Sequence, residues 1–168
     1  TNLRDLLSRV PLQTKEIAHL IQCGALDGLG ESRAALLAEA ESIGRAVSAH
    51  QLAFDFGEVT AVPPEDATQR FEWEKYILGM PISVTPLELA PESNGLPIRD
   101  LPQTRGRRVT VAGYRLPGWT GGKGWFLCDG DNFIIAQSQD KPKPWEEVVV
   151  VNGRYRSDEW GGGWFQVE

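Results

Sequence analysis

Apolar residues recur at helical spacing along the first fifty residues. The pattern predicts three helices, at 3–10, 14–23 and 31–47, because each stretch places apolar side chains three or four residues apart. Thr14 is the expected cap of the second helix, and Gly24, which tolerates a left-handed backbone, is expected to end it. The apolar positions are Leu3, Leu6, Leu7 and Val10, then Ile17, Leu20 and Ile21, then Leu36, Leu37, Ala40, Ile43, Gly44 and Val47.

A fourth helix is expected from Ala67 to Leu78, capped by Asp66 and ended by Gly79 with Pro81. Its apolar positions at helical spacing are Trp73, Tyr76, Ile77 and Met80. Prolines then recur at 81, 86, 91, 97 and 102. This spacing predicts an extended connector that crosses a surface between 81 and 106.

The remainder of the chain follows strand patterns. Five short segments are rich in β-branched and aromatic residues, and Asp129-Gly130-Asp131 is typical of a hairpin turn. These segments are 108–114, 125–128, 132–136, 147–151 and 163–167. We therefore expect an α+β protein of two domains: an N-terminal helical part and a C-terminal small antiparallel β-barrel, for which the oligonucleotide-binding (OB) fold is the commonest five-stranded form. Gly113 is expected to mark a bend in a long first strand.

Composition is that of a soluble globular protein, with 41% hydrophobic and 24% charged residues in 168. The formal net charge of −6 argues against a protein that grips phosphate backbones over its whole surface, so any nucleic-acid contact must be local. The acidic surplus lies in the middle: residues 51–101 carry three basic and nine acidic side chains, whereas 102–168 carry nine and eight.

Cys23 and Cys128 lie far apart in apolar runs, which favours reduced core thiols over a disulfide or a metal site and suits a cytoplasmic protein. No apolar run approaches the roughly 18 residues of a membrane span, so no membrane partner is expected. The two histidines and the carboxylates have no catalytic or metal-ligand spacing, and we expect no catalytic residue, metal or cofactor. Thr1 is not an initiator methionine, which suggests a piece of a longer protein.

The connector Gly28-Leu29-Gly30 between two predicted helices is a candidate DNA-backbone site. Two glycines allow a sharp turn, and the start of the next helix offers free amides and a positive dipole end to a phosphate oxygen. We therefore expect DNA contacts from Gly28, Gly30, Ser32 and Arg33, as in a helix-hairpin-helix. The alternative is a helix-turn-helix corner with a purely structural glycine cap.

The stretch Gln51-Leu52-Ala53-Phe54-Asp55-Phe56-Gly57 precedes an acidic linker with Pro63-Pro64. A polar residue followed by apolar side chains at near-alternating positions is typical of a peptide that docks into a partner's groove. The same alternation also fits an ordinary strand that buries three side chains.

Aromatic and basic residues of the predicted barrel are candidates for a single-strand-binding face, since bases stack on aromatic rings and phosphates pair with cations. The candidates are Arg115, Trp119, Lys123, Trp125, Phe126 and Trp164. Alternating aromatic residues in a small barrel are also common in its core, so both interpretations stay open.

Taken together, several segments resemble the region behind the catalytic core of the bacterial replicative DNA polymerase, the DNA polymerase III alpha subunit. The most specific segment is the run from Leu20 to Arg33, with its Leu-Ile-x-x-Gly-Ala-Leu-Asp-x-Leu-Gly-x-x-Arg pattern. The other segments are Leu3 to Val10, Ala34 to Leu37, Trp73-Glu74-Lys75, Leu78-Gly79, Pro86-Leu87 and Val109 to Gly113. The resemblance spans nearly the whole chain.

The resemblance implies a helix-hairpin-helix half at 1–49, a clamp-binding peptide and linker at 50–62, a helix and connector at 63–104 and an OB-like barrel at 105–168. It places Gln51, Leu52, Phe54 and Phe56 at the family's peptide for the β sliding clamp, with Phe54 where the family has Leu or Met. Only the second half of the family's tandem hairpin domain is present, so binding to duplex DNA is expected to be weak.

Two further departures concern the end of the fourth helix and the barrel. Val84-Thr85-Pro86-Leu87 stands where the family often has Gly-His-Pro-Leu, and prolines 142 and 144 interrupt the place of the usual barrel helix. The metal-binding aspartates of the polymerase core are absent. The resemblance therefore implies a noncatalytic part of a DNA-directed DNA polymerase, located in the bacterial cytoplasm at the replication fork, with clamp, duplex and single-stranded template as expected partners. The alternative is a standalone single-strand-binding barrel with a helical extension.

Overall fold

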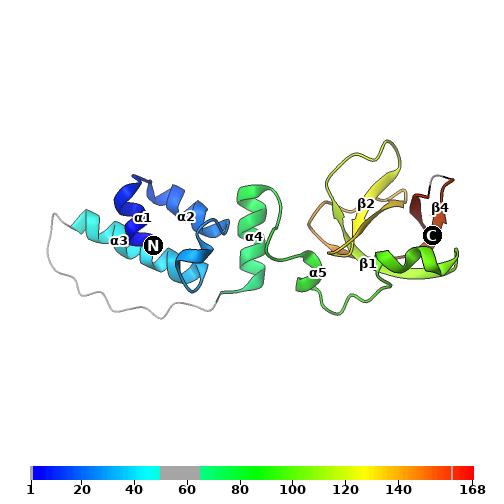
Figure 1. Cartoon of the computed structure of the whole chain (residues 1–168), viewed down its shortest axis with the longest axis horizontal. Coiled ribbons are helices and arrows are strands. Elements are labelled where there is room, and N and C mark those ends of the chain that lie inside the picture. The colour runs from blue at the N-terminus through cyan, green and yellow to red at the C-terminus, as the bar shows by residue number, and fades with distance from the viewer. Residues whose placement is uncertain (1, 50–64, 160) are drawn as a thin grey trace. The chain divides into compact units, whose positions relative to one another are not determined.

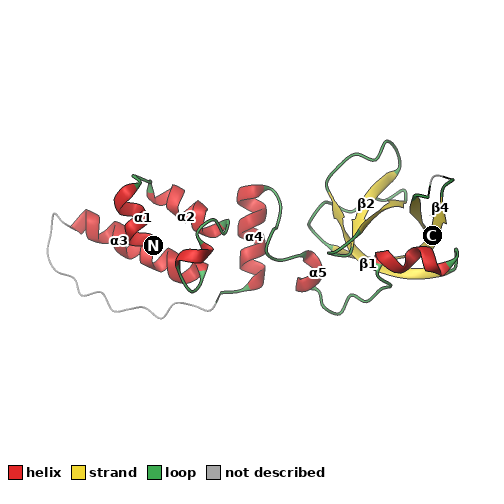
Figure 2. Ribbon diagram, in the orientation of Figure 1, coloured by secondary structure: helices red, strands yellow, loops and turns green. Residues whose placement is uncertain are grey.

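The computed structural model describes residues 2–49, 65–159 and 161–168 (Figures 1 and 2). The chain divides into two compact units, 1–83 and 84–168. The first unit is helical and the second contains a closed five-stranded barrel, so the expected α+β composition is confirmed. Within the described residues, no helix is long and apolar enough to cross a membrane.

The described residues of the first unit, 2–49 and 65–83, form four α-helices and one 3-10 turn. They are α1 (Leu3–Arg9), α2 (Thr14–Gln22), η1 (Asp27–Leu29), α3 (Arg33–Ala49) and α4 (Ala67–Leu78). The apolar faces of α1, α2 and α3 meet in one core. Its buried members are Leu3, Ile17, Ile21, Leu36 and Ala40, all from the predicted faces.

Most of the predicted helix ends are confirmed. Gly24 (φ +83°) and Gly79 (φ +76°) adopt left-handed conformations after α2 and α4. The Asp66 side chain accepts from the amide of Thr68 at the start of α4. The expected cap at Thr14 is wrong by one residue: Gln13 precedes α2, and its amide donates to the Glu16 carboxylate at 2.8 Å.

The expected apolar face of α4 is also wrong. The buried residues of α4 are Phe71 and Glu74, whereas Tyr76 is 80% exposed and Met80 lies beyond the helix. Glu74 occupies an inward position because an arginine from another helix neutralises its charge. An apolar pattern cannot reveal a buried carboxylate of this kind.

A buried ion pair between Arg33 and Glu74 holds α3 and α4 together. Arg33 Nη1 lies 2.8 Å from Glu74 Oε1, and the two side chains are 4% and 1% exposed. The other Arg33 nitrogens donate to both carboxylate oxygens of Asp27, and Nη1 also donates to the carbonyl of Gln22. Glu74 further accepts from the amides of Ile82 and Ser83 and from the Ser83 hydroxyl. The pair therefore joins the end of α2, η1, α3, α4 and the segment after α4.

Five strands close the barrel of the second unit in the order β1-β2-β3-β5-β4. They are β1 (Arg108–Leu116), β2 (Gly124–Cys128), β3 (Phe133–Gln137), β4 (Val148–Ser157) and β5 (Gly163–Val167). The expectation of an antiparallel barrel is confirmed for four of the five strand pairs and is wrong for β3 and β5, which pair in parallel. A closed ring with an odd number of strands cannot alternate direction everywhere, so at least one pair must be parallel. The barrel fits the expected OB-like form.

The segment before the barrel is part of its core, which corrects the expectation of a simple surface connector. It forms the short helix α5 (Pro86–Leu89) and the 3-10 helix η2 (Ile98–Thr104). Ile98 and Leu101 are buried with the barrel residues Val111, Trp125, Leu127, Ile134, Ala136 and Phe165. The amide of Ile98 also donates to Asp129 Oδ2 at 2.7 Å, so the turn between β2 and β3 anchors this segment.

The turn between β2 and β3 forms as the sequence predicts, and Gly113 lies where backbone approaches closely. The turn closes with a hydrogen bond from the Asn132 amide to Asp129 Oδ1, and Gly130 has φ +102°. At Gly113, β1 passes from pairing with β4 toward pairing with β2. A Cβ at Gly113 would collide with the carbonyl oxygen of Cys128. Both cysteines are free thiols; Cys128 is buried, as expected of a core thiol, whereas Cys23 is only half-buried.

The buried pair predicts a pH dependence for the helical unit. Burial raises the pKa of the Glu74 carboxyl, but hydrogen bonds from Ser83, Ile82 and Arg33 outweigh this and lower the pKa from 4.5 to about 2. Because the folded pKa lies below the unfolded one, the stabilisation is complete above about pH 4.5 and is lost as the pH falls toward 2. Helical stability, measured by urea unfolding and circular dichroism, should therefore fall between about pH 4.5 and about pH 2.

Glu74→Gln tests the origin of this dependence. The change leaves the Arg33 guanidinium without its buried counter-charge and should destabilise the helical unit by about 3 kcal/mol at neutral pH. It should also flatten the pH dependence. Glu72→Gln, at an exposed position on the same helix, is the matched control and should leave both quantities unchanged. An equally steep pH dependence in Glu74→Gln would contradict the assignment to Glu74.

Candidate nucleic-acid interface

Three sites were expected from the sequence, and the structure describes two of them. Gln51, Leu52, Phe54 and Phe56, the expected clamp-binding residues, lie outside the described residues. The hairpin turn of the first unit and the outer surface of the barrel are described, and each is built from its residues below.

The turn between α2 and α3 is made by η1 and its flanking glycines. Gly28 is exposed, and a Cβ added to it would meet no atom within 4 Å. Gly30 is different: a Cβ there would stand 2.8 Å from two atoms of the buried Leu36 side chain. Gly30 is therefore required by packing, whereas the fold does not explain the glycine at position 28. A missing side chain at an exposed turn allows close approach of another molecule.

Ser32 and Arg33 have structural roles in this turn. The Ser32 hydroxyl accepts from the amide of Ala35 at 3.1 Å and so caps α3. The Arg33 guanidinium, expected at the surface, is occupied by Asp27, Glu74 and the Gln22 carbonyl. A phosphate contact by the Arg33 side chain does not fit this geometry, because the side chain is 4% exposed.

The amide at the start of α3 already holds an anion. The Arg33 amide donates to Glu65 Oε2 at 2.6 Å, and the other Glu65 oxygen lies 3.3 Å from Arg70 Nε. This is the position at which a helix N-terminus would present an amide to a phosphate oxygen. A hollow of about 400 Å³ beside it is lined by Asp27, Glu31, Ser32, Arg33, Glu65 and Arg70. Three of these six residues are acidic, so the hollow does not attract phosphate as it stands.

The outer surface of the barrel carries a row of paired apolar and aromatic residues. Phe126 of β2 pairs with Ile135 of β3, which pairs with Trp164 of β5. Trp164 in turn pairs with Arg156 of β4. Directly paired residues share a face, and the neighbours of this row, such as Trp125 and Phe165, point into the core. We call Phe126, Ile135, Trp164 and Phe133 the aromatic row.

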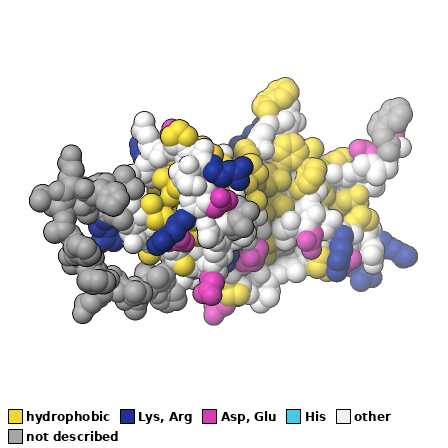
Figure 3. Space-filling view, turned by 60° about the vertical axis from the view of Figure 1, so that its left-hand side comes forward, with side chains coloured by type: hydrophobic (Ala, Val, Ile, Leu, Met, Phe, Trp, Pro, Cys, Tyr) yellow, Lys and Arg dark blue, Asp and Glu magenta, His cyan; other side chains and the backbone are white. Residues whose placement is uncertain are grey.

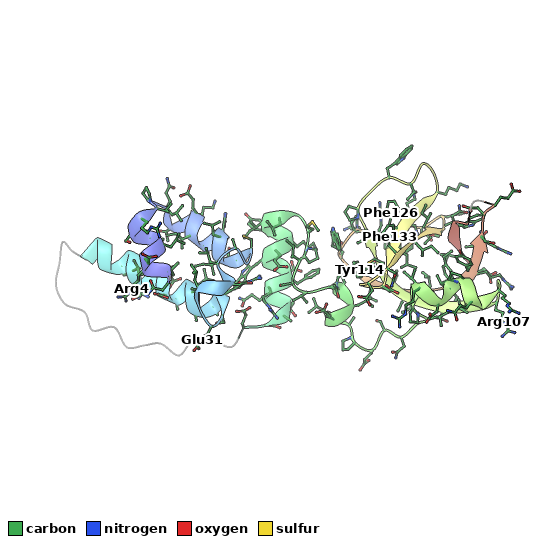
Figure 4. All side chains as sticks on the ribbon, in the orientation of Figure 1. Arg4, Glu31, Arg107, Tyr114, Phe126 and Phe133 are labelled. Carbon is green, nitrogen blue, oxygen red and sulfur yellow. The ribbon has the colours of Figure 1, made fainter. Side chains whose placement is uncertain are left out.

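Phe133 is the most exposed member of the aromatic row. It precedes Ile135 by two positions on β3, so both side chains lie on the same face, and it is 64% exposed. Its ring meets the edge of Phe126 with centroids 5.8 Å apart at 86° (Figure 4). Trp164 is half-buried, and its indole N–H has no partner among the described residues. Exposed rings on a sheet face are stacking platforms for nucleotide bases.

The loop between β1 and β2 lies beside this row. A Cβ on Gly118 would stand 2.9 Å from Phe126 Cε2, so the loop backbone passes directly over the edge of that ring. The loop carries Trp119, which is 86% exposed, and the exposed Lys123. A hydrogen bond from Lys141 Nζ to the Gly122 carbonyl fixes its far end. The loop that passes Phe126 at Gly118 thus carries one exposed ring and one exposed positive charge.

The structure separates the six expected single-strand-binding residues into two groups. Phe126 and Trp164 belong to the aromatic row, and Trp119 and Lys123 lie in the adjoining loop. Trp125 is instead 2% exposed and donates from Nε1 to the Ser138 hydroxyl, so it cannot stack on a base. Arg115 pairs with the buried Leu127, and its Nη1 donates to the carbonyl of Pro142. Neither of these two lies on the outer row.

Sequence reasoning missed Phe133 and Glu65. Residues 132–136 and 125–128 are nearly continuous apolar runs, so the alternation that assigns side chains to the inside or outside is hidden. The outward direction of Phe133 follows only from the register, in which Ile135, two positions further along β3, pairs with Phe126. Glu65 precedes the Asp66 cap, and nothing in its local sequence indicates a contact with α3.

Comparison with known proteins supports a relationship to replicative polymerases. The chain is 26% identical to the DNA polymerase III subunit alpha of Vibrio cholerae over 201 aligned positions, which cover 96% of this chain. The alignment spans only 17% of that protein's length. No family model matches the chain. The similarity over nearly the whole chain indicates a region related to the alpha subunit of a replicative DNA polymerase.

Proposed function

We propose that this chain is a noncatalytic region of a bacterial replicative polymerase alpha subunit, acting in the cytoplasm at the replication fork. In this proposal the barrel, an OB fold, holds single-stranded template DNA on its aromatic row, and residues 51–56 bind the β sliding clamp. The observation that carries the proposal is the aromatic row on the outer face of a closed barrel, with Phe133 64% exposed, in a chain of which 96% aligns with a polymerase alpha subunit.

The geometry of the row supports a single strand as its ligand. Phe126 and Phe133 offer rings without hydrogen-bonding groups, and the indole N–H of Trp164 is buried, so the row suits sequence-independent stacking. Lys123 and Trp119 lie on the loop that covers one end of the row. In a duplex the bases are stacked inside the helix, so they could not stack on the aromatic row.

A contact between the hairpin turn and duplex DNA is a secondary part of the proposal. The exposed Gly28 is the residue best placed for it. The Glu65 carboxylate on the α3 amide opposes it, which agrees with the weak duplex binding expected from the sequence.

The alternative function is a standalone single-strand-binding module, in which residues 51–56 have a structural role. The barrel geometry supports it equally well. Binding to the clamp distinguishes the two functions, because only the first requires it.

Phe133→Ala tests the aromatic row. Loss of one stacked base should weaken binding to a fluorescent oligothymidine about tenfold, measured by anisotropy, with weaker quenching of tryptophan fluorescence. Val150→Ala is the control, because Val150 is 52% exposed on β4 but lies outside the row. Both variants should unfold at the temperature of the wild type. Equal affinity of Phe133→Ala and wild type would remove the row from the binding surface.

Glu65→Ala tests the hairpin turn. Removal of the carboxylate frees the Arg33 amide, so the salt-sensitive affinity for a short duplex should rise several-fold. Glu31→Ala is the charge-matched control, because Glu31 is exposed and lines the same hollow. A similar rise in both variants would show an effect of net charge alone. Gly28→Ala, which has room for its methyl group, should cancel the gain when it is combined with Glu65→Ala.

Gln51→Ala combined with Phe56→Ala tests the clamp peptide. The wild-type chain should bind a purified bacterial sliding clamp in a pull-down, and the double variant should not, because it lacks both the rim amide and a pocket ring. His50→Ala, just outside the peptide, should bind like the wild type. Retention of the double variant on the clamp would favour the standalone module.

A further inference from the structure

Five arginines gather where β1 begins and β4 ends. Arg108 pairs directly with Arg154 in the β1–β4 ladder. Arg105 and Arg107 precede β1, and a hydrogen bond from Arg154 Nη1 to the Gly106 carbonyl ties that segment to β4. Arg156 follows on β4. These five are the arginine face, and they are five of the six arginines between 105 and 168.

The arginine face has a local positive surplus in a chain of net charge −6. Arg105, Arg107, Arg108 and Arg156 are exposed. One carboxylate, Glu168, lies 3.4 Å from Arg108 Nε and 2.7 Å from Arg154 Nε. Arg105 and Arg107 form no ion pair with any described residue. Asp158 and Glu159, in the loop after β4, are the other acidic residues that follow Arg156 in sequence. Figure 3 shows dark blue side chains gathered over the barrel, and Figure 4 labels Arg107.

Arg105 holds an uncommon backbone conformation. Its φ of +51° and ψ of +40° are left-handed, and Gly106 after it has φ +72°. A left-handed residue with a long side chain costs free energy, and glycine or asparagine would occupy the position more cheaply. The arginine at this turn is therefore not explained by backbone geometry. A conformational outlier of this kind is a reason to look for a function.

The arginine face is continuous with the aromatic row. Arg156 pairs with Trp164, and Trp164 pairs with Ile135, which pairs with Phe126. From β2 to β4 the surface crosses three strand spacings, or about 14 Å. Arg154 and Arg108 extend the positive charge one further strand around the barrel to β1. One continuous surface thus passes from ring platforms to guanidinium groups.

We propose that the arginine face binds the phosphate backbone of the same single strand whose bases lie on the aromatic row, so that the strand wraps around the barrel from β2 toward β4 and β1. The inference rests on the proposed function and extends it to a second surface. Guanidinium groups donate paired hydrogen bonds that match phosphate oxygens. An acidic protein segment would also satisfy the charge, but it would not use the adjoining rings. Continuity with the row therefore favours nucleic acid.

The experiment compares short and long oligothymidines on the full 168-residue chain. Arg107→Gln combined with Arg156→Gln removes two exposed charges. These two arginines are chosen because Arg107 has no ion pair among the described residues and Arg156 interacts with Glu168 only at longer range. Affinity for a long oligothymidine that spans both surfaces should fall at least about tenfold. A plot of the logarithm of the binding constant against the logarithm of the salt concentration should become shallower by about 1.4. Affinity for a tetramer that covers only the aromatic row should be unchanged.

Arg45→Gln combined with Lys143→Gln is the charge-matched control, since both side chains are exposed and lie elsewhere. An equal loss in this control, or no loss in the arginine variant, would overturn the inference while leaving the aromatic row intact. Failure of the wild type to bind any oligothymidine would overturn both. Poly-glutamate of the same length is the third probe. If it binds the wild type as tightly as the oligothymidine, and the arginine variant loses both alike, the partner is an acidic protein segment.

Discussion

The helical unit depends on one buried carboxylate. Glu74 is fully buried on α4, and its oxygens accept hydrogen bonds from Arg33, from two amides after α4 and from the Ser83 hydroxyl. Because charge cannot be buried without partners, each of these groups fixes the position of the others. Arg33 in turn holds Asp27 and the Gln22 carbonyl. Ion pairing thus places α4 against a hairpin whose own core is apolar and does not include α4 residues.

Local sequence rules predicted the elements of the fold more successfully than their burial. Caps such as Asp66, left-handed glycines such as Gly24, and the Asp129–Asn132 turn depend on a few neighbouring residues, so the sequence contains the information. The inward face of α4 depends on a partner 41 residues away, and an apolar pattern does not record it. Likewise, prolines 97 and 102 suggested an open connector. Instead they flank Ile98 and Leu101, which fill the barrel.

The sequence indicates the candidate sites by residue type, but it does not show which of these residues lie on the outer face of the sheet. Phe126 and Trp164 were identified with Trp125, although only the first two face outward. A continuous apolar run does not show which of its residues face the core and which face outward, and the strand pairing in the closed barrel decides this. The arginines were overlooked for a related reason. Arg107 and Arg156 are far apart in sequence, and only the β1–β4 ladder brings their segments together.

The hydrogen bond from Ile98 to Asp129 limits where recombination could join this barrel to another protein. Ile98 and Leu101 belong to its core, and the Leu96 amide donates to the Thr110 carbonyl of β1. A recombination junction placed just before β1 would remove Ile98 and Leu101 from the core and would leave Asp129 Oδ2 without its donor. A junction near residue 84 would keep both inside one inherited piece. Chimeric chains assembled with barrels from related proteins should therefore tolerate a junction near residue 84 far better than one just before β1.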